Sequence, residues 1–450
     1  MSTKPLLAFY GDDFTGSSDA MEALALAGLR TVLFLAPPSA QVLQARFADA
    51  RCIGVAGTSR AMSPAQMDAG LMPVLRSLWS LGAPLLHYKV CSTFDSSPAV
   101  GNIGHVIDYA RAQLTGARTL SVLAGVPQLR RYTVFGNHMA AAGDEIYRLD
   151  RHPTMSRHPT TPMDEADLRV HLARQTKASC ALMSVLDLEG DYARIDARHA
   201  ERMRNHPDLL LYDVLDETRL RAAGRLIWNE AQRAPHFIVG SSGVGYALAA
   251  HWRESGLIPG QRAVFPRIEP REQILVMSGS ASLLTAQQIS WAAAHGFDTI
   301  RASAPELVQA GRAAQVSRDL VERALASFKQ GKSVLIYSAV GPDDASLSAT
   351  REQVPSGEST AKLLGGAMGR IARELLARTS LRRVVIAGGD TSSYAAQELG
   401  LYALEMKAEL TPGAPLCRAH SDDPRIDGLE IALKGGQMGK VDYFGLARGS

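Results

Sequence analysis

Short apolar runs alternate with longer segments of helical periodicity along most of the chain. The apolar runs, such as PLLAFYG near the start and RVVIAGGD near the end, are mostly continuous rather than alternating with polar residues. Continuous runs are typical of strands buried on both faces of a parallel sheet. Segments between them, such as SSDAMEALALAG, carry apolar residues at helical spacing. The pattern predicts an α/β protein with largely parallel sheets.

The predicted strands fall into two groups. The first comprises PLLAFYG, RTVLFLA, CIGVAG, LLHYKVC, TLSVLAGVP, ALMSVLD, LLLYDVLD and HFIVGSS, and the second QILVMSGS, FDTIRAS, SVLIYSAV, RVVIAGGD and LEIALKGG. Residues 255–272, between the groups, contain three prolines and two glycines and show no clear periodicity, which is typical of a linker. We therefore expect two α/β domains, residues 1–254 and 273–450. Residues 127–165 are predicted as a long irregular segment, and such a segment inside a domain is usually functional or an excursion between domains.

Composition excludes several classes of protein. The 450 residues suit one very large or two ordinary domains, and 46% apolar with 21% charged residues is normal for a large buried core. The net charge of +3 is spread along the chain, so no nucleic-acid partner is expected. No apolar run reaches the ~18 residues of a membrane span, and acidic residues come too early for a signal peptide. Four cysteines without a C-x-x-C pair (Cys52, Cys91, Cys180 and Cys417) fit a reducing cytoplasm.

Polar or glycine-rich clusters follow several predicted strands, where ligands bind in parallel sheets. They are GDDFTGSSDA, STFDSSPAVGNIG, GSSGVG, SGSAS, AGGDTSS and KGGQMGK. The last three are rich in Gly and Ser, and backbone amides in such loops bind phosphate oxygens. None matches a P-loop, and GSSGVG is not G-x-G-x-x-G, which disfavours a dinucleotide-dependent dehydrogenase. Each loop alone could be a tight turn; together the three predict a nucleotide-phosphate site.

The two N-terminal clusters carry carboxylates, amides and hydroxyls suited to a polyol acid. Asp12, Asp13 and Asp95 can accept hydrogen bonds from sugar hydroxyls, and Lys89 and Arg131 can neutralise a carboxylate. Further candidate substrate-binding residues are Thr15, Gly16, Ser92 and Asn102. Helix capping is an equally good explanation for Asp12 or for Asp19. The His152-Pro153 and His158-Pro159 steps do not share a helical face, and the metal ligands stay unassigned.

The order of the motifs resembles the four-carbon acid sugar kinase family, from Gly11 to Phe444. The matching segments are GDDFTGSSDA, KVCSTFDSSPAVGNIG, SRHPTTPM, VMSGSAS, IAGGDTSS, ELTPGAP and ALKGGQMGKVDYF. The resemblance implies a sugar-acid-binding N-terminal domain, a nucleotide-binding C-terminal domain, and ATP-dependent phosphorylation of acids such as threonate, erythronate or 3-oxo-tetronate. It places the ATP contacts on Ser278, Gly388, Gly389, Asp390, Thr391 and Gly436. It also makes His158 a candidate for the substrate site.

The chain departs from the family pattern at three places. Asp390 stands where the family usually has Glu, GGQMG replaces Ser-Gly-Asn-Phe-Gly, and Pro127-Gln-Leu-Arg-Arg131 replaces PxNGR. The last change favours an altered 3-oxo acid, such as 3-oxo-isoapionate, over plain 3-oxo-tetronate. A threonate or erythronate kinase, or a catalytically degenerate nucleotide-binding regulator, remains the alternative.

The expected mechanism is phosphoryl transfer in a cleft between the two domains, with Mg²⁺ bridging the ATP phosphates. Asp13 is the first candidate for positioning or deprotonating the acceptor hydroxyl, followed by Asp12 and Asp95. The expected partners are a small sugar acid and ATP, with no nucleic acid or membrane. A homodimer is kept as an option for the assembly.

Overall fold

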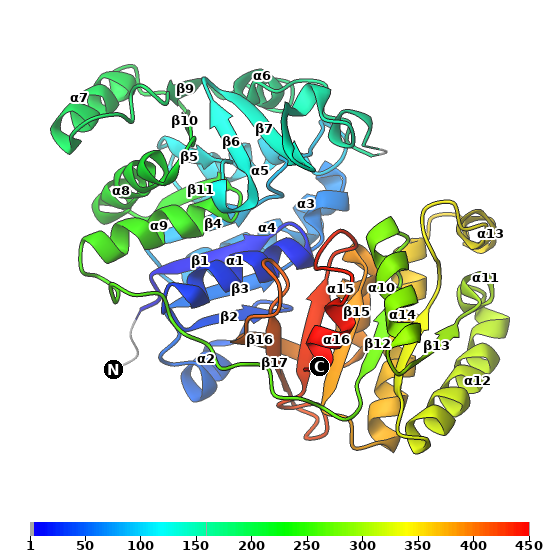
Figure 1. Cartoon of the computed structure of the whole chain (residues 1–450). Coiled ribbons are helices and arrows are strands. Elements are labelled where there is room, and N and C mark those ends of the chain that lie inside the picture. The colour runs from blue at the N-terminus through cyan, green and yellow to red at the C-terminus, as the bar shows by residue number, and fades with distance from the viewer. Residues whose placement is uncertain (1–3, 159, 450) are drawn as a thin grey trace. The chain divides into compact units, whose positions relative to one another are not determined.

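The structure is a computed structural model, and it describes residues 4–158 and 160–449. Its contacts divide the chain into two compact units. The first comprises Met1–Val32 and Ala36–Ala263, and the second comprises Leu33–Leu35 and Val264–Ser450. Each unit contains a sheet with helices packed against it (Figure 1). The expected α/β class with largely parallel sheets is therefore confirmed.

The sheet of the first unit has the strand order β3-β1-β4-β11-β5-β10-β9, and every pair in it is parallel. The strands are β1 (Leu7–Gly11), β3 (Cys52–Ala56), β4 (Leu85–Lys89), β5 (Leu120–Leu123), β9 (Cys180–Met183), β10 (Leu209–Tyr212) and β11 (His236–Gly240). β2 (Thr31–Phe34) has residues in both units. In this register Gly11 lies opposite Ala56 and Lys89, so the loops after β1, β3 and β4 leave the sheet at one edge.

Helices follow most of these strands, as the apolar periodicity predicts. They are α1 (Phe14–Leu26), α2 (Ala40–Arg46), α3 (Pro64–Gly70), α4 (Met72–Ser80), α5 (Ile103–Gln113), α6 (Leu168–Ala173), α7 (Tyr192–Met203), α8 (Glu217–Arg233) and α9 (Gly243–Glu254). α1 is buried along most of its length, with Met21 and Leu24 almost fully inaccessible. Its polar N-terminal turn is therefore held firmly at the edge of the sheet.

The expectation that residues 127–165 form an irregular loop is wrong. The segment contains a three-stranded antiparallel sheet, β6 (Arg131–Val134), β7 (Asn137–Ala142) and β8 (Glu145–Arg148). Phe135 and Gly136 both have positive φ, 52° and 81°, and form the tight β6–β7 turn. These strands are short and half-exposed, and β7 is rich in alanine, so they lack the β-branched apolar run that marked the others.

A buried carboxylate fixes this small sheet to its unit. Asp213 accepts hydrogen bonds from the backbone amides of Phe135 (2.5 Å) and Gly136 (2.9 Å), and from Val185 N (3.1 Å). Burial raises the pKa of Asp213 to about 6 despite these three donors. The β6–β7 turn is thus held against the first unit by hydrogen bonds to Asp213.

The sheet of the second unit has the order β13-β14-β12-β15-β18-β17-β16. Its strands are β12 (Leu275–Ser278), β13 (Phe297–Arg301), β14 (Ser333–Tyr337), β15 (Arg383–Ala387), β16 (Leu401–Ala408), β17 (Leu416–Ser421) and β18 (Glu430–Lys434). The first five strands of this order, β13, β14, β12, β15 and β18, pair in parallel. β17 pairs antiparallel with both β18 and β16. The sequence patterns did not predict β16 and β17, whose partly exposed faces break the continuous apolar run.

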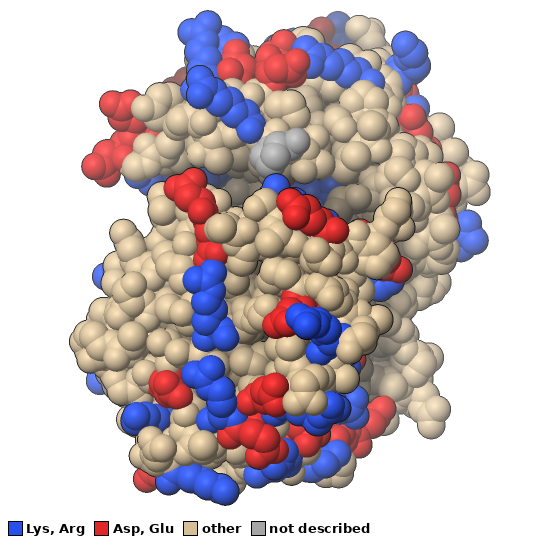
Figure 2. Space-filling model, turned by 90° about the vertical axis from the view of Figure 1, so that its right-hand side faces the viewer, with Lys and Arg blue, Asp and Glu red and all other residues tan. Residues whose placement is uncertain are grey.

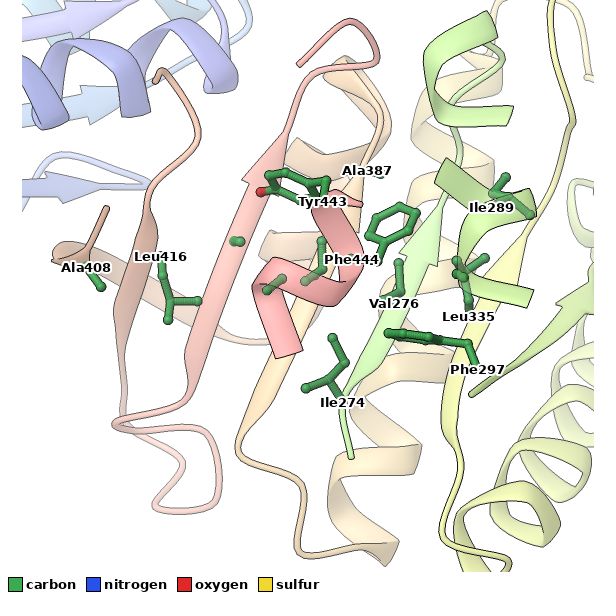
Figure 3. Close-up of a cluster of buried hydrophobic side chains, with 14 residues drawn as sticks. Ile274, Val276, Ile289, Phe297, Leu335, Ala387, Ala408, Leu416, Tyr443 and Phe444 are labelled. Atoms are coloured by element: carbon green, nitrogen blue, oxygen red, sulfur yellow. The ribbon is translucent and has the colours of Figure 1, made fainter. Parts of the chain in front are cut away.

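Helices cover both faces of this second sheet, with α16 in front of the strands and α14 behind them (Figures 1 and 3). The helices are α10 (Leu283–Ala294), α11 (Ala304–Leu307), α12 (Ala310–Lys329), α13 (Ser346–Gln353), α14 (Thr360–Arg378), α15 (Gly389–Glu398) and α16 (Tyr443–Arg448). Figure 3 shows Phe444 of α16 packed over Val276, with Ile274 and Phe297 nearby, in a buried apolar cluster. This buried core fixes the positions of β12, β15 and β18, and so of their carboxyl ends, relative to one another.

Basic and acidic side chains are interspersed on the face shown in Figure 2 rather than gathered into a patch of one sign. On this face the distribution agrees with the even spread of charge along the sequence. Within residues 4–158 and 160–449, no helix combines the length and apolarity that a membrane crossing requires.

Candidate functional site

The first cluster of carboxylates lies where β1 passes into α1. Asp12 N donates to Lys89 O of the neighbouring strand (2.9 Å), which extends the sheet register by one residue. Asp13 is the N-cap of α1, and its Oδ1 accepts from Gly16 N (2.9 Å). The capping interpretation of Asp12 or Asp19 is therefore wrong, because the helix begins at Phe14. Asp19 lies within α1, where it is buried.

The ammonium of Lys89, at the end of β4, lies close to the carboxylates of both Asp12 and Asp13. Its Nζ lies 3.6 Å from Asp13 Oδ1 and 3.9 Å from Asp12 Oδ1, and the residue is only 3% exposed. A Cβ on Gly16 would lie 1.6 Å from Lys89 Nζ and 2.3 Å from Asp13 Oδ1. The glycine is thus required for the ammonium to reach the first turn of α1.

Arg60, which the sequence analysis did not single out, completes this cluster. It lies in the short 3₁₀ turn Ser59–Ala61 after β3, and its backbone amide donates to Asp12 O (3.1 Å). Its NH1 lies 3.1 Å from Asp13 Oδ2, and its side chain is 30% exposed. In the sequence, Arg60 belongs to the polar TSR segment that follows the predicted strand CIGVAG. Its place beside Asp12 and Asp13 becomes apparent only once β3 is known to pair with β1. We call Asp12, Asp13, Arg60 and Lys89 the acid site.

The electrostatics of the acid site separate its two aspartates. Burial raises the pKa of Asp12 to about 7, against the opposing effect of Lys89. Burial would also raise the pKa of Asp13, but Arg60, Lys89 and the Gly16 amide together hold it below its usual value. Asp12 Oδ1 has no hydrogen-bond partner among the described residues, whereas both oxygens of Asp13 are engaged. The pKa values of two adjacent carboxylates are thus shifted in opposite directions.

The second predicted loop, after β4, borders the acid site. Cys91 N donates to Asp12 Oδ2 (3.2 Å), and Thr93 Oγ1 donates to Asp95 Oδ1 (2.5 Å) within the same turn. Phe94 has a φ of 56°, a conformation that bulky side chains rarely adopt, and it is fully buried. Asn102 caps α5 through His105 N (2.8 Å), and its amide also donates to Pro98 O (3.0 Å). The side chain of Asn102 is therefore committed to the fold of the loop.

The remaining sugar-site candidates lie in or beside the small antiparallel sheet. Ser92 O bonds with His138 Nε2 of β7 (2.8 Å), and this contact joins the loop after β4 to that sheet. Arg131 NH1 donates to Leu129 O (2.9 Å), and its Nε has no partner in the described part of the chain. His158 Nδ1 accepts from Thr161 N (3.1 Å). No hydrogen bond or ion pair of residues 4–158 and 160–449 connects Arg131 or His158 to Asp12 or Asp13.

In the second unit, the three predicted phosphate loops converge at the ends of β12, β15 and β18. A Cβ on Gly279 would lie 2.5 Å from the Thr391 side chain, and one on Gly388 would lie 3.2 Å from Ser280 N. A Cβ on Gly436 would lie 2.8 Å from Ser280 Oγ. The loops therefore approach one another as closely as glycine permits, as a site built from backbone amides requires.

The loop after β15 opens directly into α15. Gly388 has a φ of 127°, which only glycine adopts readily, and Gly389 is the first residue of the helix. A Cβ on Gly389 would have no heavy atom within 4 Å. Thr391 is buried in the first turn, whereas the side chain of Asp390 lies outside the described part of the structure. Ser278 Oγ is buried and has no partner among the described residues.

Among the described residues there is no group of three or more His, Cys, Asp or Glu side chains that could hold a metal ion. A dedicated protein cage for a divalent cation therefore does not occur in that part of the chain. Mg²⁺ commonly keeps several waters and binds through substrate phosphates, so the glycine-rich loops fit it only as a companion of a nucleotide.

Comparison with known proteins identifies the class. The model of a sugar-binding N-terminal domain matches residues 7–248, and that of a nucleotide-binding C-terminal domain matches residues 275–444. The chain therefore belongs to the four-carbon acid sugar kinase family, as the order of its motifs predicts, and the expectation of a sugar-acid phosphotransferase is confirmed.

Individual relatives sharpen this result. The chain is 49% identical to the 3-oxo-isoapionate kinase of Paraburkholderia graminis, covering 98% of this chain and 94% of that relative. It is 32% identical to the 3-oxo-tetronate kinase of Cupriavidus necator, covering 99% and 96%. A crystal structure of a Haemophilus influenzae protein superposes with a TM-score of 0.72 at 25% identity, covering 98% and 99%. A Salmonella typhimurium structure, at 22% identity and a TM-score of 0.77, shares the fold.

Proposed function

We propose that this protein transfers the γ-phosphoryl group of ATP to a hydroxyl of a 3-oxo sugar acid, and that 3-oxo-isoapionate is its acceptor. The observation that carries the mechanism is the acid site, where two adjacent carboxylates have pKa values pushed in opposite directions beside two cations. Groups separated in this way are typical of acid–base chemistry near neutral pH.

Asp12 is the general base in this proposal, in place of Asp13. A base works best when its pKa lies near the working pH, and the Asp12 pKa of about 7 meets that condition. Its unpartnered Oδ1 can accept the proton of the acceptor hydroxyl. The hydroxyl oxygen then forms a bond to the γ-phosphorus as the bond from that phosphorus to the bridging oxygen breaks, and ADP leaves. The proton stays on Asp12 until it passes to solvent.

Asp13 and the two cations position the acid rather than move protons. Asp13 is ionised and held by Arg60 and Lys89. Arg60 is the more exposed cation, 30% against 3% for Lys89, and its guanidinium can grip a carboxylate while it keeps its contact with Asp13. In this proposal Arg60 takes the substrate carboxylate, for which the sequence had suggested Lys89 and Arg131. Arg131, Ser92 and His158 remain candidates for the rest of the sugar.

The nucleotide is assigned to the loops of the second unit. At Gly389 the space beside the backbone is open, which leaves room for phosphate oxygens, and the N-terminus of α15 adds a favourable dipole for negative charge. Ser278 Oγ is a further donor without a partner in the described structure. Bound together with the nucleotide, Mg²⁺ would neutralise charge on the phosphates.

The choice of acceptor rests on the relatives and on one loop. Identity to the 3-oxo-isoapionate kinase is 49%, against 28–32% to 3-oxo-tetronate kinases. The Pro127–Arg131 segment, which departs from the family pattern, forms a 3₁₀ turn leading into β6, and Arg130 adopts a φ of 56° there. A cytoplasmic location is part of the proposal and is supported by four free cysteines.

A coupled assay of ADP release tests the function. Purified protein is given ATP with 3-oxo-isoapionate, 3-oxo-tetronate, threonate or erythronate in turn. We expect the highest kcat/KM with 3-oxo-isoapionate, by about tenfold or more over 3-oxo-tetronate, a discrimination of the size that one buried contact supplies. A higher kcat/KM with threonate or erythronate would instead indicate a threonate or erythronate kinase. Folded protein that binds ATP and turns over none of the acids would instead indicate a regulator.

A further inference from the structure

The loop Lys434–Lys440, here called the nucleotide loop, turns its carbonyl groups toward α10. Gly436 O accepts from Ser282 Oγ (2.5 Å) and from Thr285 Oγ1 (3.1 Å). Gln288 Nε2 donates to Met438 O (3.1 Å) and Lys440 O (2.8 Å). Ser282, Thr285 and Gln288 are spaced by three, so they share one face of α10. One helix face therefore holds much of the loop's backbone.

Lys434 reinforces this arrangement from the end of β18. It is fully buried, and its Nζ donates to Thr285 Oγ1 (3.1 Å), Gly435 O (3.0 Å) and Gly436 O (3.4 Å). These contacts use all three protons of the ammonium. No ion pair with a described carboxylate accompanies them, and burial lowers the pKa of Lys434 to about 8. A buried ammonium without a counter-charge is costly, which calls for a compensating anion.

Planarity of the peptide bond fixes where the amides of the loop point. In a trans peptide the C=O of one residue and the N–H of the next point in opposite directions. The carbonyls of Gly436 and Met438, which accept from α10 side chains, therefore turn the N–H groups of Gln437 and Gly439 away from that helix. The Gly435 carbonyl accepts from Lys434 Nζ, so the N–H of Gly436 points away from that ammonium. The N–H groups of Gly436 and Gln437 donate to no partner in the described structure. They form a row of free donors of the kind that binds phosphate.

We propose that Lys434 is a positioning residue for the nucleotide. Together with Thr285 it holds the carbonyls of the nucleotide loop inward, so that its amides are preset for phosphate oxygens, and the phosphate charge in turn compensates the buried ammonium. This inference rests on the proposed use of ATP. It assigns to Lys434 no contact with ATP, because its three donors are already used.

The test compares four variants of the full-length protein. Lys434→Met removes the ammonium, Thr285→Val removes the hydroxyl at nearly constant volume, and Thr285→Ser keeps that hydroxyl. Lys329→Met, an exposed lysine at the end of α12, controls for the loss of one positive charge. Two quantities are measured for each: the Kd for ATP by calorimetry without sugar acid, and amide hydrogen exchange of peptides covering the nucleotide loop without any ligand.

We expect Lys434→Met to weaken ATP binding by about tenfold to a hundredfold and to accelerate exchange in the nucleotide loop, because hydrogen bonds to a charged group are lost. Thr285→Val should weaken ATP binding by about tenfold, whereas the Kd for ATP of Thr285→Ser and of Lys329→Met should stay within about threefold of the wild-type value. The KM for the sugar acid should not change in any of them. A purely structural role would change the melting temperature and both KM values together.

Two outcomes are kept distinct. If wild-type protein binds no ATP, the proposed function fails, and the role given to the nucleotide loop fails with it. If wild-type protein binds ATP and folded Lys434→Met and Thr285→Val bind it equally well, with unchanged exchange in the loop, only this inference is overturned.

Discussion

At the scale of the residue, the acid site shows how neighbours with the same side chain can lie in different electrostatic environments. Asp13 lies at the first turn of α1, where a backbone amide and Arg60 favour its ionised form. Asp12, one residue earlier, is 3% exposed and keeps one oxygen without a hydrogen-bond partner in the described structure. Sequence alone cannot separate them, because the difference arises from Arg60, in the turn after β3, and from Lys89, at the end of β4.

The first prediction concerns Asp12. Its folded pKa of about 7 lies above the ordinary carboxyl value, so between about pH 4 and pH 7 the folded state binds more protons than the unfolded state. The contribution of Asp12 to stability therefore falls as pH rises through this window. Asp12→Asn should reduce kcat by about a hundredfold or more at pH 8 and leave the melting temperature equal to or above that of wild type.

The pH dependence of the wild-type enzyme checks the same assignment. The value of kcat/KM for the sugar acid should fall below about pH 7, as Asp12 becomes protonated. Asp13→Asn should instead raise the KM for the sugar acid and lower the melting temperature, because it keeps the helix cap but removes the charge that pairs with Arg60 and Lys89. A normal kcat for Asp12→Asn with a strongly reduced kcat for Asp13→Asn would return the base to Asp13.

A second prediction concerns Gly16. Gly16→Ala places a Cβ on top of Lys89 Nζ and Asp13 Oδ1, at 1.6 and 2.3 Å, so the ammonium must withdraw from the first turn of α1. We expect kcat/KM for the sugar acid to fall by about tenfold or more, the size of effect expected for losing a charge-assisted contact. ATP affinity, measured by calorimetry, should be unchanged. Gly311→Ala, at an exposed position of α12 with no atom within 4 Å of the new Cβ, serves as the control for a glycine-to-alanine change within a helix.

At the scale of the element, the sequence predicts the buried parallel strands well and the short antiparallel ones poorly. β1, β12 and β15 each lie in a largely apolar run that ends at a glycine or directly before one. The small sheet Arg131–Arg148 depends on turn residues with positive φ and on the carboxylate of Asp213, and neither leaves an apolar pattern. Arg60 was missed for a related reason, since its role requires the order of strands.

The start of α15 gives a third prediction, at this scale. Gly389→Val adds a side chain to open space, because no described heavy atom lies within 4 Å of the new Cβ. It should weaken ATP binding by about tenfold or more through overlap with the phosphates, while the melting temperature changes by only a few degrees. Gly388→Val is the comparison variant. Because a φ of 127° excludes a β-branched residue, this variant should unfold at a markedly lower temperature than wild type. Unchanged ATP affinity in Gly389→Val would count against phosphate binding at this helix.

At the scale of the whole molecule, the two units carry complementary chemistry. The first presents carboxylates and cations at the ends of β1, β3 and β4, and the second presents glycines and hydroxyls at the ends of β12, β15 and β18. Family matches at residues 7–248 and 275–444 divide the chain in the same sense, into sugar-binding and nucleotide-binding parts. The order of seven weak motifs along the chain indicated this division where each motif alone did not.

The most direct measurement of the proposed function is the product of a single incubation with ATP and 3-oxo-isoapionate, followed by phosphorus NMR and mass spectrometry. We predict one phosphorylated acid and one ADP for each ATP consumed, with no free phosphate beyond the background hydrolysis of Asp12→Asn. ATP consumption that yields only free phosphate, or no consumption by folded protein that binds ATP, would contradict phosphoryl transfer to this acid.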